Sequence, residues 1–146
     1  MVEIKASFMT KTNLDNVLQK RIHEHTKAVY ERKKKDEWYI VAACSASLND
    51  SSYELGVNGA AKESDYDPRL VARVKTRFGG KTIGEKTGLV PWEIGRCAEQ
   101  HAANEVLKKS RTALIDDFQF SDAVYAKCPT MKKESCLNCK SIFDQL

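Results

Sequence analysis

The chain has 146 residues, the usual size of one domain, and we expect a single domain spanning residues 1–146. Its hydrophobic content is 42% and its charged content 30%, as in ordinary soluble proteins, and no run of about 18 apolar residues exists to cross a bilayer. The net charge of +4 allows a polyanionic partner but is well below that of a dedicated nucleic-acid coat protein. The N-terminus, MVEIKASFMTK, lacks the pattern of a secretory signal.

The first half of the chain predicts one helix followed by a hairpin. Apolar residues at near-helical spacing predict an amphipathic helix over residues 13–35. The charged run 31–37 favours a solvated turn, with a surface role preferred over phosphate contact. The apolar run 38–48 predicts a buried strand with Cys44 in the core, and residues 53–57 predict its hairpin partner, ended by the Asn58-Gly59 turn.

The second half predicts three more helices and one strand. Leu70, Val71 and Val74 indicate a short helix, and the glycines between residues 79 and 95 indicate a loop. Residues 95–109, rich in Ala, Glu, Leu and Lys, predict a helix that opens near Arg96. The sequence DAVYAK predicts a strand over residues 122–127, and residues 135–146 fit a short final helix.

The cysteines indicate a metal site. Their number is odd and a chain of this length does not depend on disulfides, so clustered thiols favour metal binding or catalysis. Cys97 and the pair Cys136 and Cys139 each open a predicted helix, where free N–H groups stabilise thiolates. Three thiolates suit a catalytic Zn2+ with an open fourth position, and Glu99 is placed to carry protons.

These motifs are similar to a known enzyme superfamily. Cys97-Ala98-Glu99 and the CLNC of residues 136–139 resemble the zinc-dependent cytidine deaminase superfamily. The phrase GRCAEQHAANEVL, residues 95–107, most resembles the bacterial polymorphic-toxin deaminases, the YwqJ-like and related groups. The resemblance runs from about Leu14 to the last residue. It implies an α/β fold, a cytidine-deaminase-like three-layer α-β-α domain with a mixed sheet.

Three departures from the family pattern are visible. Ser135 stands where the family usually has proline before the first cysteine of the pair. The segment from Cys128 to Cys136 is long and basic, either a substrate-contacting insertion or a surface loop. Seven residues follow Cys139, whereas the family normally adds two strands after that helix, so we expect a sheet shortened at the C-terminus or completed in another way.

The resemblance also implies roles for single residues. Glu99 would move the proton of the zinc-bound water, which attacks C4 of cytosine, and the backbone N–H of Ala98 would contact the ring carbonyl. Asn58 would bind the sugar. Two further roles follow from position in the chain: Trp92, just before the helix that opens near Arg96, could stack on a base, and Cys128, which ends the predicted strand, could line the pocket.

Alternatives remain open for several of these residues. Asn58 is also a good turn residue, Trp92 could cover the core, and Cys128 could be an inert thiol. A structural zinc site would need a fourth ligand, from Cys128 or His101. We expect His101 instead to pack against its neighbours or to contact a metal ligand without binding the metal itself.

The expected function is therefore the hydrolytic deamination of cytosine to uracil in nucleic acid. We expect DNA, single-stranded or locally opened, with RNA as a second substrate, because phosphate contacts suit the basic segment. The resemblance implies a secreted or delivered toxin-type effector that acts in the target-cell cytoplasm, with an immunity protein as partner; otherwise we expect a cytoplasmic protein. The alternatives are a deaminase of free cytidine or nucleotides, an adenine deaminase, and a non-catalytic zinc-stabilised interaction domain.

Overall fold

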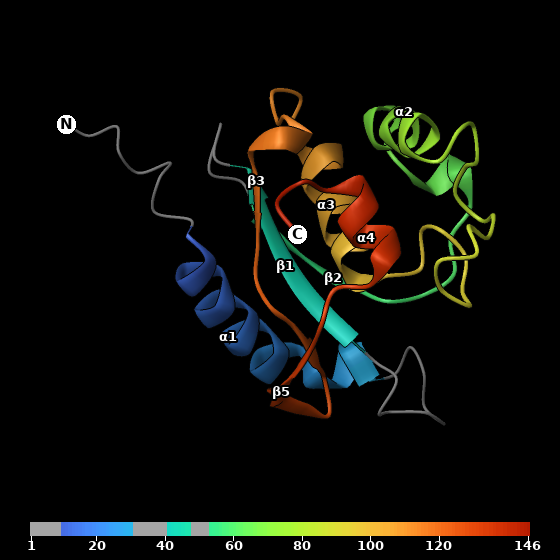
Figure 1. The fold of residues 1–146 in the computed structure, drawn as a ribbon. Helices are drawn as coiled ribbons and strands as arrows, with labels where there is room; N and C mark the ends of the chain where they lie inside the picture. Colours follow the sequence, from blue (N-terminus) through green and yellow to red (C-terminus); the bar gives the residue numbers. More distant parts are fainter. Residues whose placement is uncertain (1–9, 31–40, 48–52) are drawn as a thin grey trace.

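The computed structural model describes residues 10–30, 41–47 and 53–146 (Figure 1). They form a mixed α/β domain with helices and short strands. The helices are α1 (Lys11–Tyr30), α2 (Pro68–Arg77), α3 (Ala98–Lys109) and α4 (Leu137–Ile142). The strands are β1 (Val41–Ser47), β2 (Tyr53–Val57), β3 (Phe118–Phe120), β4 (Ala123–Tyr125) and β5 (Cys128–Lys133). Short 3-10 turns occupy Glu63–Asp65 and Ile115–Asp117.

The strands form one sheet in the order β2-β1-β4-β5, with β3 also paired to β1. Ala42 lies opposite Val57 of β2 and opposite Val124 of β4, so β1 is central. Each strand pair in the described ranges is antiparallel, so the mixed sheet implied by the resemblance is not found there. The reason is that β3, β4 and β5 follow one another through short turns, whereas a parallel neighbour needs a longer crossover.

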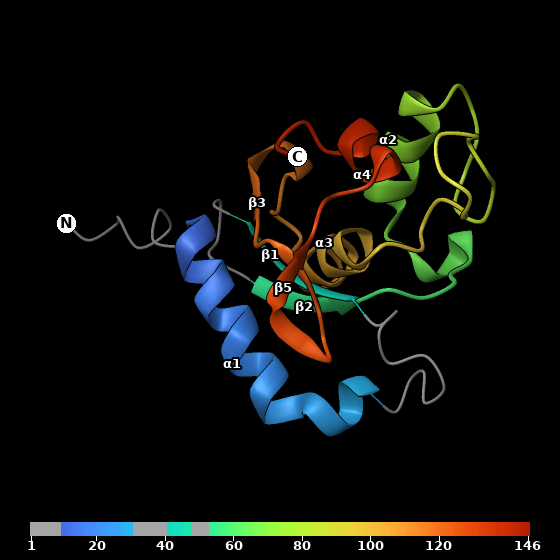
Figure 2. The same ribbon diagram turned by 60° about the horizontal axis from the view of Figure 1, so that its bottom comes forward.

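The sheet lies between two helical layers (Figures 1 and 2). On one side α1 buries Leu14, Leu18 and Ile22, spaced by four residues, against Val57 and Val124 of the sheet. The other side is covered by α3, with α2 and α4 beyond it, and apolar residues of these three helices share one cluster with Phe118 and Phe120. Two separate cores therefore hold the sheet in place.

The predicted elements of the first half are largely confirmed. The first helix spans residues 11–30, and residues 31–37 and the turn at 49–52 lie outside the described residues. The first strand covers residues 41–47 and includes Cys44, whose side chain also lies outside the description. The hairpin partner at 53–57, the helix around Leu70 and the glycine-rich loop are found.

The segment after α3 differs from the prediction. The strand expected at 122–127 is the shorter β4, it is preceded by β3, and the presumed loop from Cys128 is β5. Tyr125 pairs with Cys128 across a tight turn, so Cys128 begins a strand and does not end one. Pro129 is compatible with β5 because this strand forms the edge of the sheet.

Residues 137–146 contribute a helix to the domain and no strand to the sheet. The final helix is shorter than expected, at Leu137–Ile142, and residues 143–146 form no strand. The sheet instead gains its edge strand, β5, before α4. Within residues 10–30, 41–47 and 53–146, no helix combines the length and apolar character needed to cross a bilayer.

Gly56 sets the distance between β2 and α3. A Cβ atom at this position would lie 2.5 Å from the carbonyl oxygen of Ala98 and closer still to the backbone nitrogen of Ala102. Both obstacles are backbone atoms of α3, which cannot rotate away. The helix can rest on the sheet at this height only because residue 56 has no side chain.

We expect Gly56→Ala to lower the free energy of unfolding by at least about 2 kcal/mol, because the added methyl group must push α3 off the sheet. Urea unfolding monitored by circular dichroism measures this change. Gly79→Ala is the control, since space is open there and its cost is about 1 kcal/mol from the positive φ alone. Equal losses in the two variants would contradict the close contact.

Candidate metal centre

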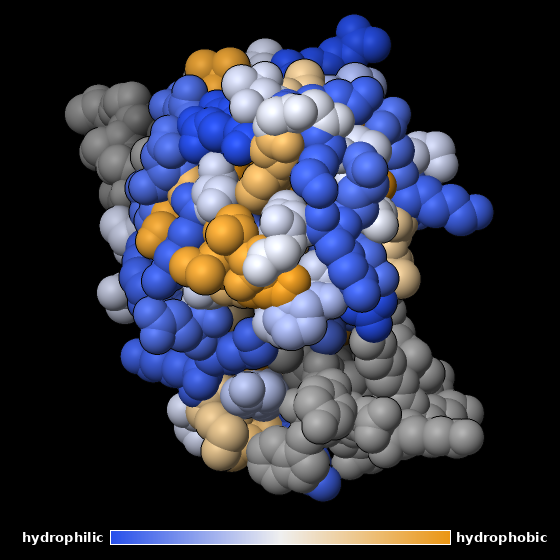
Figure 3. All heavy atoms as spheres, turned by 45° about the vertical axis from the view of Figure 1, so that its right-hand side comes forward, coloured by the Kyte–Doolittle hydropathy of each residue, from blue (hydrophilic) through white to orange (hydrophobic). Residues whose placement is uncertain are grey.

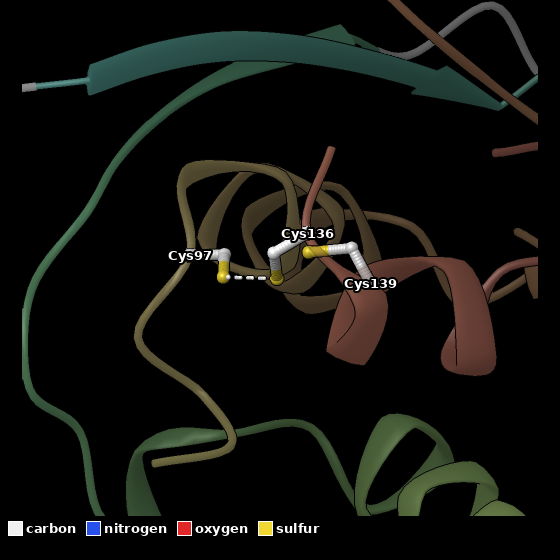
Figure 4. A group of neighbouring side chains, drawn as sticks. All are labelled: Cys97, Cys136 and Cys139. Atoms are coloured by element: carbon white, nitrogen blue, oxygen red, sulfur yellow. Dashed lines mark hydrogen bonds between the residues drawn. The ribbon is translucent and has the colours of Figure 1, made fainter. Parts of the chain in front are cut away.

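Three cysteines meet where two helices begin. Cys97 is the N-cap of α3, Cys136 is the N-cap of α4, and Cys139 lies in the first turn of α4. Their sulfur atoms lie within 4.8 Å of one another, and the sulfurs of Cys97 and Cys136 are 3.0 Å apart (Figure 4). The side chains point toward a common point between the two helices. Both predicted cysteine motifs therefore reach the same place in the fold.

The loop before α3 is held by hydrogen bonds that fix Cys97. Gly95 has a φ of 97°, and its N–H donates to the side chain of Gln100. Its carbonyl accepts a hydrogen bond of 2.8 Å from the buried hydroxyl of Tyr66. The next carbonyl, of Arg96, accepts from the N–H of Gly59 at 2.9 Å. The chain thus enters α3 from a turn tied to both neighbouring segments.

The three thiols fit a zinc ion. Sulfur atoms that share a tetrahedral zinc lie about 3.8 Å apart, as follows from Zn–S bonds of about 2.3 Å. The observed separations, 3.0 Å for Cys97 and Cys136 and at most 4.8 Å for any pair, are compatible with that spacing. Among the described residues no further His, Cys, Asp or Glu joins the group. The buried cluster could therefore hold a metal ion such as zinc with three protein ligands.

Hydrogen bonds and burial control the protons of these thiols. Hydrogen bonds from Cys139 and Cys97 lower the pKa of Cys136 to about 2, and the bond with Cys136 raises that of Cys97 to about 12. Burial raises the pKa of Cys139 well above its usual value. The three thiols thus interact through their sulfur atoms, and a divalent cation bound there would displace their protons.

Two neutral donors contact the sulfurs. The indole N–H of Trp92 donates to the sulfur of Cys97 at 3.3 Å, and the side-chain amide of Gln100 donates to that of Cys139 at 3.2 Å. Such donors stabilise thiolates and orient metal ligands.

A buried carboxylate lies beside the sulfurs. Glu99 follows Cys97 by two residues and is 4% exposed. One of its oxygens accepts a hydrogen bond of 2.9 Å from the hydroxyl of Ser135, and the other lies 3.8 Å from the sulfur of Cys139. Burial raises the pKa of Glu99, while the hydrogen bond from Ser135 and the charge of Lys133 oppose this shift. The carboxyl group is therefore suited to accept and release a proton.

The remaining predicted residues lie at different distances from the centre. Ala98, 1% exposed, begins α3 next to the sulfurs. Asn58 is half-buried after β2, and its neighbour Gly59 is bonded to the loop that carries Cys97. Trp92 contacts the centre through its N–H, and the ammonium of Lys133 lies 5.4 Å from its ring centroid.

Two candidates for a fourth ligand are used elsewhere. A ring nitrogen of His101 lies 2.7 Å from the carbonyl oxygen of Gly59, and its ring packs edge-on against Tyr66. The expectation of a packed histidine is thus confirmed. Cys128 does not belong to the sulfur group; its sulfur lies 3.5 Å from the hydroxyl oxygen of Thr130 at the start of β5. The prediction that Cys128 ends a strand is wrong, because this residue begins β5.

Ser135 and Gln100 are functional residues that the sequence reasoning missed. Ser135 was noted only as a replacement for proline, yet its hydroxyl holds Glu99. Gln100 is completely buried in α3. The one hint of its contact with Cys139 in the sequence is that a polar residue directly follows the Cys97-Ala98-Glu99 motif.

Exposed apolar side chains border the start of α4. Leu137 is 51% exposed and Leu89 is 47% exposed. The hydroxyl of Thr87 accepts from the N–H of Leu89 and donates to the side chain of Asn138, which brings the two segments together. Apolar residues gather on the face drawn in Figure 3, surrounded by hydrophilic ones. The border of the centre on this side is therefore apolar.

No protein-family model, curated protein or solved structure matches this chain.

We expect Cys136→Ser to lower the zinc content from about one ion per chain to a small fraction, and to lower the melting temperature with it, because metal binding and folding are coupled. Elemental analysis and thermal unfolding measure both effects. A chelator should destabilise the wild type and leave the variant nearly unchanged.

Cys128→Ser is the matched control, since it removes a thiol that lies outside the cluster. An unchanged zinc content in Cys136→Ser, or equal losses in the two variants, would refute the ligand assignment.

Proposed function

We propose that the chain is a zinc-dependent hydrolytic deaminase that converts cytosine to uracil in nucleic acid, with single-stranded or locally opened DNA as the preferred substrate. The observation that carries this proposal is the buried carboxylate of Glu99 beside three thiols that could hold zinc. A purely structural four-ligand site has no use for such a group, whereas a deaminase needs one proton carrier next to its metal.

The residues divide the chemistry between them. A zinc ion held by Cys97, Cys136 and Cys139 would supply Lewis acidity and lower the pKa of a water molecule. Glu99 would accept a proton from the attacking water and deliver protons to the ring nitrogen and the departing amine, so that water and cytosine would become uracil and ammonia. Ser135 fixes one oxygen of Glu99, and the other remains at the sulfur group.

The start of α3 offers a donor for the base. Ala98 is the first residue of the helix, where backbone N–H groups have no partner within the helix. We place the ring carbonyl of cytosine at this N–H. Trp92 contributes by holding Cys97 and by offering one ring face to a base.

Two other functions have specific support. The position of Asn58, next to the residue bonded to the Cys97 loop, favours a sugar contact and hence a free cytidine or nucleotide deaminase. The complete burial of Cys139 favours a non-catalytic zinc-stabilised interaction domain, because the cluster ties α4 to α3. Cytosine is preferred over adenine on the resemblance alone.

The biological setting is a proposal of the same kind. The similarity of residues 95–107 to polymorphic-toxin deaminases supports a delivered effector that acts in the cytoplasm of a target cell. Such an effector would have an immunity protein as its partner.

We expect Glu99→Gln to reduce uracil formation by at least about 100-fold with zinc content unchanged, because the amide cannot accept the proton. Uracil is measured after incubation with single-stranded DNA, duplex DNA, RNA and free cytidine. Glu105→Gln is the control, an exposed carboxylate on the same helix that pairs with Lys108.

The pattern of products separates the functions. Uracil from free cytidine alone would overturn the nucleic-acid substrate. Zinc binding without product on any substrate, in wild type and variant alike, would overturn catalysis and favour the interaction domain.

A further inference from the structure

A second feature of the molecule is a cleft of about 540 Å³ between the β3–β4 turn, the end of β5 and α4. Its volume is that of an ordinary ligand site. The charged side chains that line it are Lys11, Lys132, Lys133, Lys140, Asp122 and Glu134. Four lysines thus face two carboxylates, and the cleft has an excess of positive charge.

The ion pairs of the cleft reduce this excess without removing it. Asp122 contacts both Lys11, at 2.6 Å, and Lys132, at 3.0 Å, and Lys11 also pairs with Asp15 at 3.1 Å. Glu134 pairs with Lys140 at 3.2 Å. These pairs hold the ammonium groups near the cleft without neutralising them all, an arrangement suited to an anion.

Lys133 adds a positive charge that is not part of these ion pairs. Within the described residues no carboxylate pairs with it, and its ammonium lies over the ring of Trp92 instead. It also lowers the pKa of Glu99 through its charge, which places it near the metal centre.

The cleft and the metal centre share one segment of chain. Ser135 lines the cleft and donates a hydrogen bond to Glu99. Lys133 lines the cleft and contacts Trp92, which in turn is bonded to Cys97. A ligand that extends from the centre along residues 133–135 would therefore enter the cleft.

We propose that this cleft binds a phosphate group of the substrate strand, next to the nucleotide whose base occupies the metal centre. The inference rests on the proposed function and assigns the strand backbone to a defined surface. Lysine ammonium groups bind phosphate chiefly through charge, and such contacts dominate the affinity of proteins for single strands and make it depend on salt.

The test measures binding separately from catalysis. The zinc-loaded chain is titrated into a fluorescent oligothymidine, which contains no cytosine, and anisotropy is recorded at several salt concentrations. Lys132→Gln and Lys140→Gln should each raise the dissociation constant by about 3- to 10-fold at low salt and reduce the salt slope by roughly 0.7.

Lys108→Gln is the matched control. Lys108 is also exposed and paired with a glutamate, but it lies at the far end of α3, about 16 Å along the helix from Cys97. It should leave the dissociation constant unchanged. Equal weakening in all three variants would overturn the proposal, because binding would then follow total charge.

Removal of a carboxylate gives a test of opposite sign. Glu134 is 85% exposed, so Glu134→Gln should fold normally and tighten oligothymidine binding by about 2- to 5-fold, because a repulsive charge leaves the cleft. Asp122→Asn should act in the same direction, with thermal unfolding used to verify its fold. Weaker or unchanged binding in a folded Glu134→Gln would count against an anion site.

A phosphate could also belong to a free nucleotide. If Lys132→Gln and Lys140→Gln reduce kcat/KM for cytidine monophosphate but leave oligothymidine binding unchanged, the strand assignment is overturned. Uracil formation in DNA with an unaltered KM in both lysine variants would overturn this inference and leave the proposed function intact. Oligothymidine binding that is lost in these variants, without uracil from any substrate, would support the cleft and refute the deaminase.

Discussion

At Gly56 the backbone of β2 lies against the backbone of α3 with no side chain between them. This contact fixes how far α3 stands from the sheet and therefore where its first turn, with Cys97 and Glu99, can be. This short distance between α3 and the sheet allows Ala102 and Ala103 to be fully buried. It also leaves room for α2 and α4 on the outer side of α3. The centre therefore depends on a missing side chain in a strand that contributes no ligand.

The centre gathers groups that repel one another when ionised. Three thiols and one carboxyl group lie together, and burial raises the pKa of Cys139 and of Glu99. The positive ends of two helices and the charge of Lys133 reduce the repulsion, and a divalent ion would reduce it further. Charge balance is thus a physical reason for a metal here that is independent of any reaction.

Local patterns predicted most of the helices and the identity of the sulfur group. The spacing of Leu14, Leu18 and Ile22 predicted α1, and the order of the cysteine motifs predicted which thiols meet. The short strands were missed because FQF has only three residues, too few for a pattern to stand out, and because the edge strand CPTMKK contains proline and two lysines.

Contacts between distant segments could not be predicted from spacing. Ser135 and Glu99 are 36 positions apart, and nothing in either neighbourhood indicates the other. The prediction that Cys128 ends a strand was wrong for a related reason, since the hairpin turn before it has no strong turn residue. Pairings of this kind follow from the folded sheet, which a linear pattern does not contain.

The shortness of α4 has a consequence for the order in which the molecule is completed. A helix of six residues does not persist alone in water, so α4 depends on the burial of Ile142 and Phe143 and on its link to α3. During synthesis Cys97 leaves the ribosome 39 residues before Cys136 and has to wait as a solitary thiol. An ion at this site could be bound by all three thiols only after α4 has been synthesised, so metal binding would follow the formation of α3 rather than precede it.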